Sequence, residues 1–79
     1  MAVYVDDGRY RFGRMIMCHM WADTQDELDI FARAIGLRLS WKHRDHYDIA
    51  LSKRRDAIRH GAIEITQREA LRFRRGPQT

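Results

Sequence analysis

Apolar and polar residues alternate along the chain in patterns that predict four short strands. Residues 2–5 alternate apolar and polar side chains, which is typical of a strand. Residues 14–20, "RMIMCHM", have the sulfur-rich and β-branched character of a buried strand, with His19 near its end. Residues 37–41, "LRLSW", alternate with period two, and residues 62–65, "AIEI", form a further short apolar run. Glycines bound residues 7–13, "DGRYRFG", so that segment is predicted to be a loop.

A capping signal predicts the first helix. Thr24 and Glu27 have the spacing of a capping box, so we expect a helix to begin at about Gln25 and to end at Gly36. Within it an apolar stripe recurs with helical periodicity and predicts the face that packs on the sheet. The stripe consists of Leu28, Phe31, Ala32 and Ile35.

Two further helices are predicted after residue 50. The second has Ser52 as its expected N-cap and Gly61 as its stop. Thr66 and Glu69 repeat the capping-box spacing, so a third helix is expected from about Gln67 to Arg75, followed by a frayed tail at 77–79.

These elements predict an α+β fold. We expect a small single domain spanning 1–79, with a short mixed sheet of about four strands and three helices. A chain of 79 residues cannot build a second hydrophobic core after the first. A core this small makes a homodimer plausible, although nothing in the sequence fixes the oligomeric state.

Charge changes this picture at the C-terminal end. The net charge is +4, and the excess of basic residues lies after residue 51. On the predicted third helix, Arg68, Arg72 and Arg75 form one basic stripe, which favours a protein or nucleic-acid partner as an alternative function. A solvated helical face is the commoner explanation of such a stripe.

Cysteine usage and hydropathy bear on location. Cys18 is the only cysteine, so no internal disulfide can form, and a buried structural thiol is the favoured interpretation over a nucleophile. No apolar run approaches the roughly 20 residues of a membrane-spanning helix. We therefore expect no membrane association and a cytoplasmic location.

Two polar junctions that follow apolar strands carry the candidate chemistry. They are "CHMWAD", with His19 and Asp23, and "HRDHYD", with His46, Tyr47 and Asp48. Strand ends commonly present functional groups on a rigid frame, so these residues could converge. Arg14 and Lys42 are the predicted anion contacts.

Three kinds of site fit these residues, beside a structural interpretation. Histidine and aspartate suit a divalent metal, although no HExxH or CxxC motif is present. A histidine next to Asp48 or Asp23 suits acid–base catalysis, and basic residues near the histidines suit a phosphate-bearing ligand. Alternatively, Tyr47 packs in the core, Asp48 caps the next segment and His46 is a hydrogen-bonded structural histidine.

Several segments, in this order, resemble the domain of unknown function family 4031, small proteins of bacteria and phages. The segments are "VYVDD", "CHMWAD", "ELDIFARAIGL", "HYD" and "GAIEIT". The resemblance covers the chain from Ala2 to about Leu71. It implies that His19, Asp23, His46, Tyr47 and Asp48 carry the family's motif, and it implies no activity for them.

The leading hypothesis from the sequence is a binding module that acts on a phosphate-bearing ligand such as a nucleotide. His46, Asp48 and His19 are the predicted catalytic residues, with Arg14, Asp23, Lys42 and Tyr47 as binding residues. Whether a reaction is catalysed is left open. A protein or nucleic-acid interaction through the basic stripe is the first alternative, and a divalent metal held by histidine and aspartate is the second.

Overall fold

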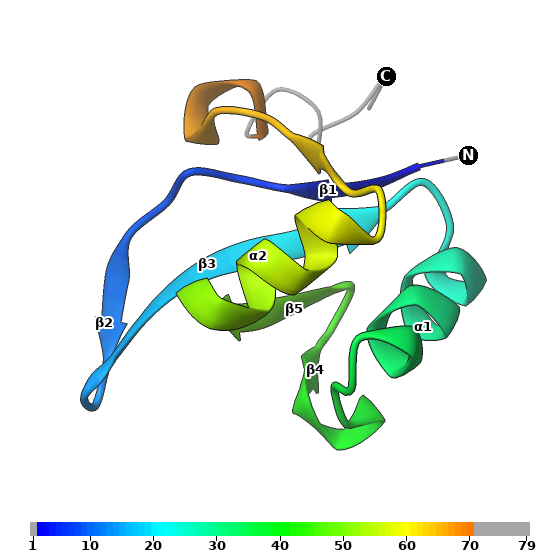
Figure 1. Ribbon diagram of the computed structural model, residues 1–79, viewed down its shortest axis with the longest axis horizontal. Coiled ribbons are helices and arrows are strands. Elements are labelled where there is room, and N and C mark those ends of the chain that lie inside the picture. The colour runs from blue at the N-terminus through cyan, green and yellow to red at the C-terminus, as the bar shows by residue number, and fades with distance from the viewer. Residues whose placement is uncertain (1, 71–79) are drawn as a thin grey trace.

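The computed structural model describes residues 2–70 and shows helices packed on one face of a mixed sheet (Figure 1). The sheet contains β1 (Val3–Val5), β2 (Tyr10–Phe12), β3 (Met15–Ala22), β4 (Lys42–His43), β5 (His46–Ala50) and β6 (Ile63–Glu64). The helices are α1 (Gln25–Ala34), the 3₁₀ turn η1 (Leu39–Trp41) and α2 (Leu51–Arg59). The predicted α+β class is confirmed, and the sheet has more strands than the four expected.

The long strand β3 organises the sheet. The strand order is β4-β5-β3-β1-β6, and β2 also pairs with β3. All pairs are antiparallel except the parallel pair of β1 with β6. In this arrangement β3 carries β1 on one edge and β5 on the other, so residues from three distant segments lie side by side.

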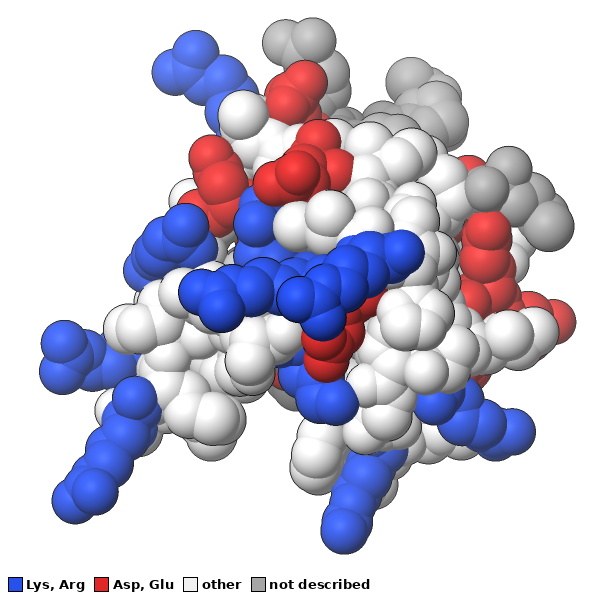
Figure 2. All heavy atoms as spheres, viewed as in Figure 1, with Lys and Arg blue, Asp and Glu red and all other residues white. Residues whose placement is uncertain are grey.

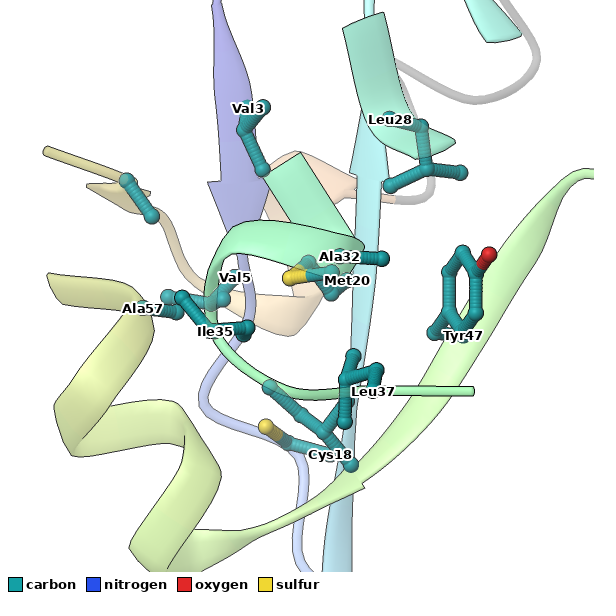
Figure 3. Packing of buried hydrophobic residues seen from close by; sticks show 12 residues of the cluster. Val3, Val5, Cys18, Met20, Leu28, Ala32, Ile35, Leu37, Tyr47 and Ala57 are labelled. Atoms are coloured by element: carbon teal, nitrogen blue, oxygen red, sulfur yellow. The ribbon is translucent and has the colours of Figure 1, made fainter. Parts of the chain in front are cut away.

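The face of the sheet that packs against α1 and α2 holds the hydrophobic core. Cys18, Met20 and Tyr47 are fully buried there and pack with Leu28 and Ala32 of α1 (Figure 3). We call this side the helix face. Because side chains alternate along a strand, the neighbours of these residues, His19, His46 and Asp48, point to the opposite side, which we call the histidine face.

The helix ends follow the predicted signals closely. The Thr24 hydroxyl accepts a hydrogen bond from the Glu27 backbone N–H at 3.1 Å, as a capping threonine should. Gly36 and Gly61 have φ values of +85° and +103°, a left-handed conformation that glycine adopts without steric cost. Both predicted helix stops are therefore confirmed.

Three local predictions are wrong. The segment 7–13 is not all loop, because Tyr10–Phe12 pairs with Met15–Met17 as a hairpin. The predicted strand 37–41 does not form, and residues 39–41 adopt the 3₁₀ turn η1 instead. The alternating residues share no buried face, because Leu37 is buried whereas Leu39 and Trp41 are 41% and 53% exposed. Ser52 is not the N-cap of α2, because the helix begins at Leu51 with Ala50 as its cap residue.

The predicted third helix is described only at its beginning. Residues 67–70 are helical, and Thr66 and Glu69 exchange side-chain and backbone hydrogen bonds at 2.8 and 3.1 Å. Arg72, Arg75 and the tail at 77–79 lie outside the described residues. Between residues 2 and 70, no helix is long and apolar enough to cross a membrane.

Basic side chains are spread over the face seen in Figure 2, with acidic side chains among them. A band of Lys and Arg crosses the region where α2 lies, and α2 contributes Lys53, Arg54, Arg55 and Arg59. Arg54 is engaged within the chain, since it donates to the Asp6 carbonyl and to Glu64. Interaction through the basic stripe stays a prediction.

Candidate functional site

A row of three polar residues crosses the histidine face. His19 on β3 lies directly opposite Asp48 on β5. On the other edge of β3, the backbone N–H of Asp6 donates to the carbonyl of His19, which extends the β1–β3 ladder by one residue. The register therefore places Asp6, His19 and Asp48 side by side, although 42 residues separate the first from the last.

His46 joins this row from the start of β5. It lies two residues before Asp48 on the same strand, so both side chains point to the same face. The ring centroids of His19 and His46 are 5.3 Å apart. The two polar junctions predicted to converge thus meet, but His19 lies within β3 rather than at its end.

The three side chains bring their ligand atoms together. One ligand atom each from His19, His46 and Asp48 lies within 4.8 Å of the others. The Nε2 atoms of His46 and His19 are 3.3 and 3.9 Å from Asp48 Oδ1. We call these three residues the His–His–Asp cluster.

A buried carboxylate orients His19. Asp6 is 1% exposed, and its Oδ2 is 2.8 Å from His19 Nδ1. Its Oδ1 accepts hydrogen bonds from the backbone N–H groups of His19 and Gly8. Burial raises the pKa of Asp6, but the hydrogen bonds from His19 and Gly8 outweigh burial and lower that pKa below its ordinary value. Asp6 is therefore a carboxylate, which can only accept, and His19 Nδ1 carries the proton.

Close packing at Gly8 supports the same carboxylate. A Cβ atom at Gly8 would come within 3.2 Å of Asp6 Oδ1, a tight contact that the carboxylate would have to relieve by moving. From α2, Arg54 Nε donates to the Asp6 carbonyl at 2.9 Å. Asp6 is thus held from its backbone and its side chain, and His19 is held through it.

Asp45 contacts Nδ1 of His46, as Asp6 contacts Nδ1 of His19, and so orients the ring. Its Oδ1 lies 3.1 Å from His46 Nδ1, so a hydrogen bond there requires the proton on Nδ1. Asp45 differs in being exposed, at the turn between β4 and β5. His43 also lies next to His46, with ring centroids 5.4 Å apart.

In the neutral tautomer with its proton on Nδ1, each histidine presents an Nε2 lone pair, and the cluster then brings three electron-pair donors together. With protons on both Nδ1 atoms, the two Nε2 lone pairs point towards Asp48 Oδ1. That oxygen is buried and has no hydrogen-bond partner among residues 2–70. Three converging acceptors repel one another unless a cation or additional protons lie between them.

Tyr10 closes one side of the cluster. Its ring packs on the His19 ring at a centroid distance of 4.9 Å. Its hydroxyl is also buried without a hydrogen-bond partner in the described chain. Burial, and then the nearby Asp48 carboxylate, raise the pKa of Tyr10 well above its ordinary value, so the hydroxyl is a neutral donor.

Four of the residues predicted to bind lie away from the cluster. Tyr47 is fully buried on the helix face and donates to Asp29, and Lys42 pairs with the same Asp29 at 3.0 Å. Asp23 follows β3 and accepts from the Ala2 backbone and the Tyr4 hydroxyl. Arg14 lies in the β2–β3 turn, five residues or roughly 16 Å along the strand from His19.

Sequence reasoning missed Asp6, Tyr10 and Asp45. Asp6 follows the alternating "VYV" strand, and continued alternation would have placed it opposite the core, but only the β1–β3 register brings it to His19. Tyr10 was assigned to a loop. Asp45 was not among the candidate residues, and it contacts His46 although its side chain is 65% exposed.

Comparison with known proteins gives the family of this fold and site. Residues 3–76 match a family described as a protein of unknown function, DUF4031. The chain belongs to the DUF4031 family. No curated protein and no solved structure matches it. In this member of DUF4031, function must be argued from the geometry of the site.

Proposed function

We propose that this protein binds a divalent transition-metal ion through His19 Nε2, His46 Nε2 and Asp48 Oδ1. The observation that carries the proposal is the convergence of these three acceptors, with both imidazole protons directed away to carboxylates. A cation is the simplest group that would satisfy all three.

The distances support a first-row ion. Two ligands bound to a tetrahedral Zn²⁺ at 2.0–2.1 Å are about 3.3 Å apart. The separation of His46 Nε2 from Asp48 Oδ1 is 3.3 Å, and that of His19 Nε2 from the same oxygen is 3.9 Å. A side-chain movement of about half an ångström would bring the second pair to the ideal separation. The three ligand atoms lie within 4.8 Å of one another, so binding an ion would close the widest pair by up to about 1.5 Å.

The surroundings of the ligands support the same proposal. Metal-bound histidines usually donate their second ring N–H to a carboxylate or carbonyl, which fixes the ring and raises its basicity. Asp6 supplies such an acceptor to His19 from a buried position, and Asp45 supplies one to His46. Two histidines and one carboxylate suit Zn²⁺ or Fe²⁺ and leave a coordination position for water or a ligand atom.

The rival explanation for the cluster is a pair of protonated histidines. In that case each Nε2–H would donate to Asp48, and the cluster would be an acid–base or purely structural group. The phosphate-bearing ligand predicted from the sequence also stays a prediction. Because Arg14 and Lys42 lie away from the cluster, an oxyanion of such a ligand would need the metal ion as its counter-charge.

A metal titration tests the proposal. The metal-free protein, purified without a histidine tag, is titrated with Zn²⁺ and Co²⁺ by calorimetry and visible absorption. We expect one ion per chain, and at 100 times the dissociation constant a stabilisation of about 2.7 kcal/mol should raise Tm.

Matched variants locate the ion. His46→Ala should weaken Zn²⁺ binding by at least about 100-fold, because it removes one of three ligands. His60→Ala is the control, since His60 is an exposed histidine at the end of α2 that bonds only to the Asp56 carbonyl in the described contacts. Equal Zn²⁺ affinity in the two variants, or no binding to the wild-type chain, would refute the proposal.

A further inference from the structure

A cavity of about 620 Å³ adjoins the His–His–Asp cluster. Its size falls within the range of small-molecule sites, roughly 300–1,000 Å³. Asp48 lies in its wall, and so does Tyr10, which packs on His19. The cavity therefore adjoins the cluster at Asp48, which belongs to both, and at Tyr10, which lines the cavity and packs on the His19 ring.

The rest of the wall is mainly apolar. It comes from the β2–β3 hairpin, from the segment around η1, from β5 and from the start of α2, where Ser52 and Lys53 add two polar side chains. The apolar side chains are Phe12, Met15, Met17, Leu37, Trp41 and Ile49. An apolar cavity with a few polar groups at one side is the usual form of a site that binds an organic molecule.

The exposure of these side chains is unusual for residues with only a structural role. Phe12 is 68% exposed, Trp41 53% and Met15 46%, although each is large and apolar. Phe12 and Met15 pair in the β2–β3 hairpin, Trp41 comes from η1, and all three line one cavity. Grouped exposed apolar residues of this kind mark binding surfaces more often than isolated ones do.

We infer that this cavity holds the apolar body of a small organic molecule whose oxyanion head binds the metal ion. The inference rests on the proposed metal site and adds the class of ligand that the site takes. The head is a carboxylate or comparable group, and the body is aromatic or aliphatic. Asp48 and Tyr10 form the polar part of the wall on the side of the cluster. The head passes these two residues to reach the ion.

The arrangement favours a small molecule over a second copy of the chain. A protein surface covering the cavity would leave the Asp48 carboxylate and the Tyr10 hydroxyl facing apolar side chains, at a desolvation cost. With the ion in place, the ion satisfies Asp48 and the oxyanion head of a ligand accepts a hydrogen bond from the Tyr10 hydroxyl. The two phenol and carboxylate groups then select for a head that binds metal and also accepts a hydrogen bond from Tyr10.

Two hydroxamates that share a metal-binding head test the inference. Benzohydroxamate carries an aromatic body and acetohydroxamate a methyl group. With the Zn²⁺-loaded full chain, benzohydroxamate should bind at least about tenfold more tightly, because its ring enters the apolar cavity. Calorimetry measures both affinities, after Zn²⁺ binding has been established without any hydroxamate.

Variants separate the cavity from the metal. Phe12→Ala and Trp41→Ala should each reduce the ratio of the two affinities by about threefold or more and leave acetohydroxamate affinity unchanged. Both residues are exposed, so the fold should tolerate the changes. Ile30→Ala is the matched control, because Ile30 is 71% exposed on α1 and does not line the cavity.

Each outcome decides between the two proposals. Zn²⁺ binding with equal affinities for the two hydroxamates, or with a ratio that Phe12→Ala and Trp41→Ala leave unchanged, would overturn the cavity inference alone. A dimer that dissociates in these variants, seen by analytical ultracentrifugation, would assign the apolar side chains to an interface and also overturn it. Failure to bind Zn²⁺ would overturn both.

Discussion

The two faces of the sheet each carry a polar cluster built around one aspartate. On the helix face, Asp29 accepts from Lys42 Nζ and from the Tyr47 hydroxyl. On the histidine face, Asp48 faces two imidazoles whose protons are directed to other carboxylates. The first cluster pairs donors with an acceptor, whereas in the second two imidazole nitrogens and a carboxylate oxygen converge, with the Tyr10 hydroxyl as a neighbouring donor.

This difference separates a structural role from a functional one. Hydrogen bonds from Lys42 and Tyr47 lower the pKa of Asp29, with the Lys42 bond as the largest cause. Burial, and then the bond to Asp29, raise the pKa of Tyr47 to about 12. The ionised Asp29 carboxylate and the neutral Tyr47 hydroxyl thus stabilise each other in these charge states. In the His–His–Asp cluster, by contrast, Asp48 Oδ1 is buried without a hydrogen-bond partner among residues 2–70, which makes the cluster a candidate for binding something else.

The largest expected contrast is between Asp48→Asn and Asp29→Asn. Asp48→Asn should reduce Zn²⁺ affinity by at least about 100-fold, because a ligand oxygen loses its charge. It should leave the Tm of the metal-free protein unchanged or raised, since it replaces a buried charged oxygen that has no hydrogen-bond partner with a neutral amide. Asp29→Asn should do the reverse, with Zn²⁺ affinity unchanged and a free energy of unfolding lower by about 1 kcal/mol.

Calorimetry and urea unfolding of the metal-free proteins measure both quantities. A loss of stability in Asp48→Asn as large as that in Asp29→Asn would show that Asp48 is already paired with protonated histidines. The proposed distinction between the faces would then fail.

A second contrast concerns how the contribution of Asp6 to the free energy of unfolding changes as the pH falls. The native pKa of Asp6 lies below its ordinary value of 3.8, so its hydrogen bonds stabilise the fold at higher pH and are lost as pH falls through the native pKa. Asp6→Asn should cost about 2 kcal/mol near neutral pH, because charge-assisted hydrogen bonds are replaced. The difference from wild type should hold above about pH 5 and shrink below about pH 4.

Urea unfolding of both metal-free proteins between about pH 3 and pH 7 measures this dependence. A difference that grows as pH falls would show that Asp6 does not have a lowered pKa. Chelator in every sample keeps the metal site from contributing.

The smallest contrast is between two neighbours on β5. Tyr47→Phe removes the hydroxyl that donates to Asp29 and should lower the free energy of unfolding by about 1 kcal/mol. Its Zn²⁺ affinity should equal that of wild type, because Tyr47 points to the helix face while His46 and Asp48 point away. Thermal unfolding and a Zn²⁺ titration measure the two effects, and weaker Zn²⁺ binding would contradict the assignment of faces.

Much of the local structure was predictable because its causes are local. Thr24 with Glu27, and Gly36 and Gly61, act within one turn of chain, so they predict helix ends correctly. The strand prediction for residues 37–41 failed because a period-two pattern does not say which apolar side chains the core accepts. It takes Leu37 and leaves Leu39 and Trp41 exposed.

The sequence by itself predicted which side chains are candidates for chemistry, because imidazole and carboxylate groups keep their properties in any fold. The candidates were His19, His46 and Asp48, with Arg14, Asp23, Lys42 and Tyr47 as binding residues. The tertiary structure decided which of the candidates meet. Strand pairing sets Asp6 and Asp48 on either side of His19, and strand alternation turns Tyr47 and Lys42 to the opposite face. Register is a property of two segments together, and so no single segment could reveal it.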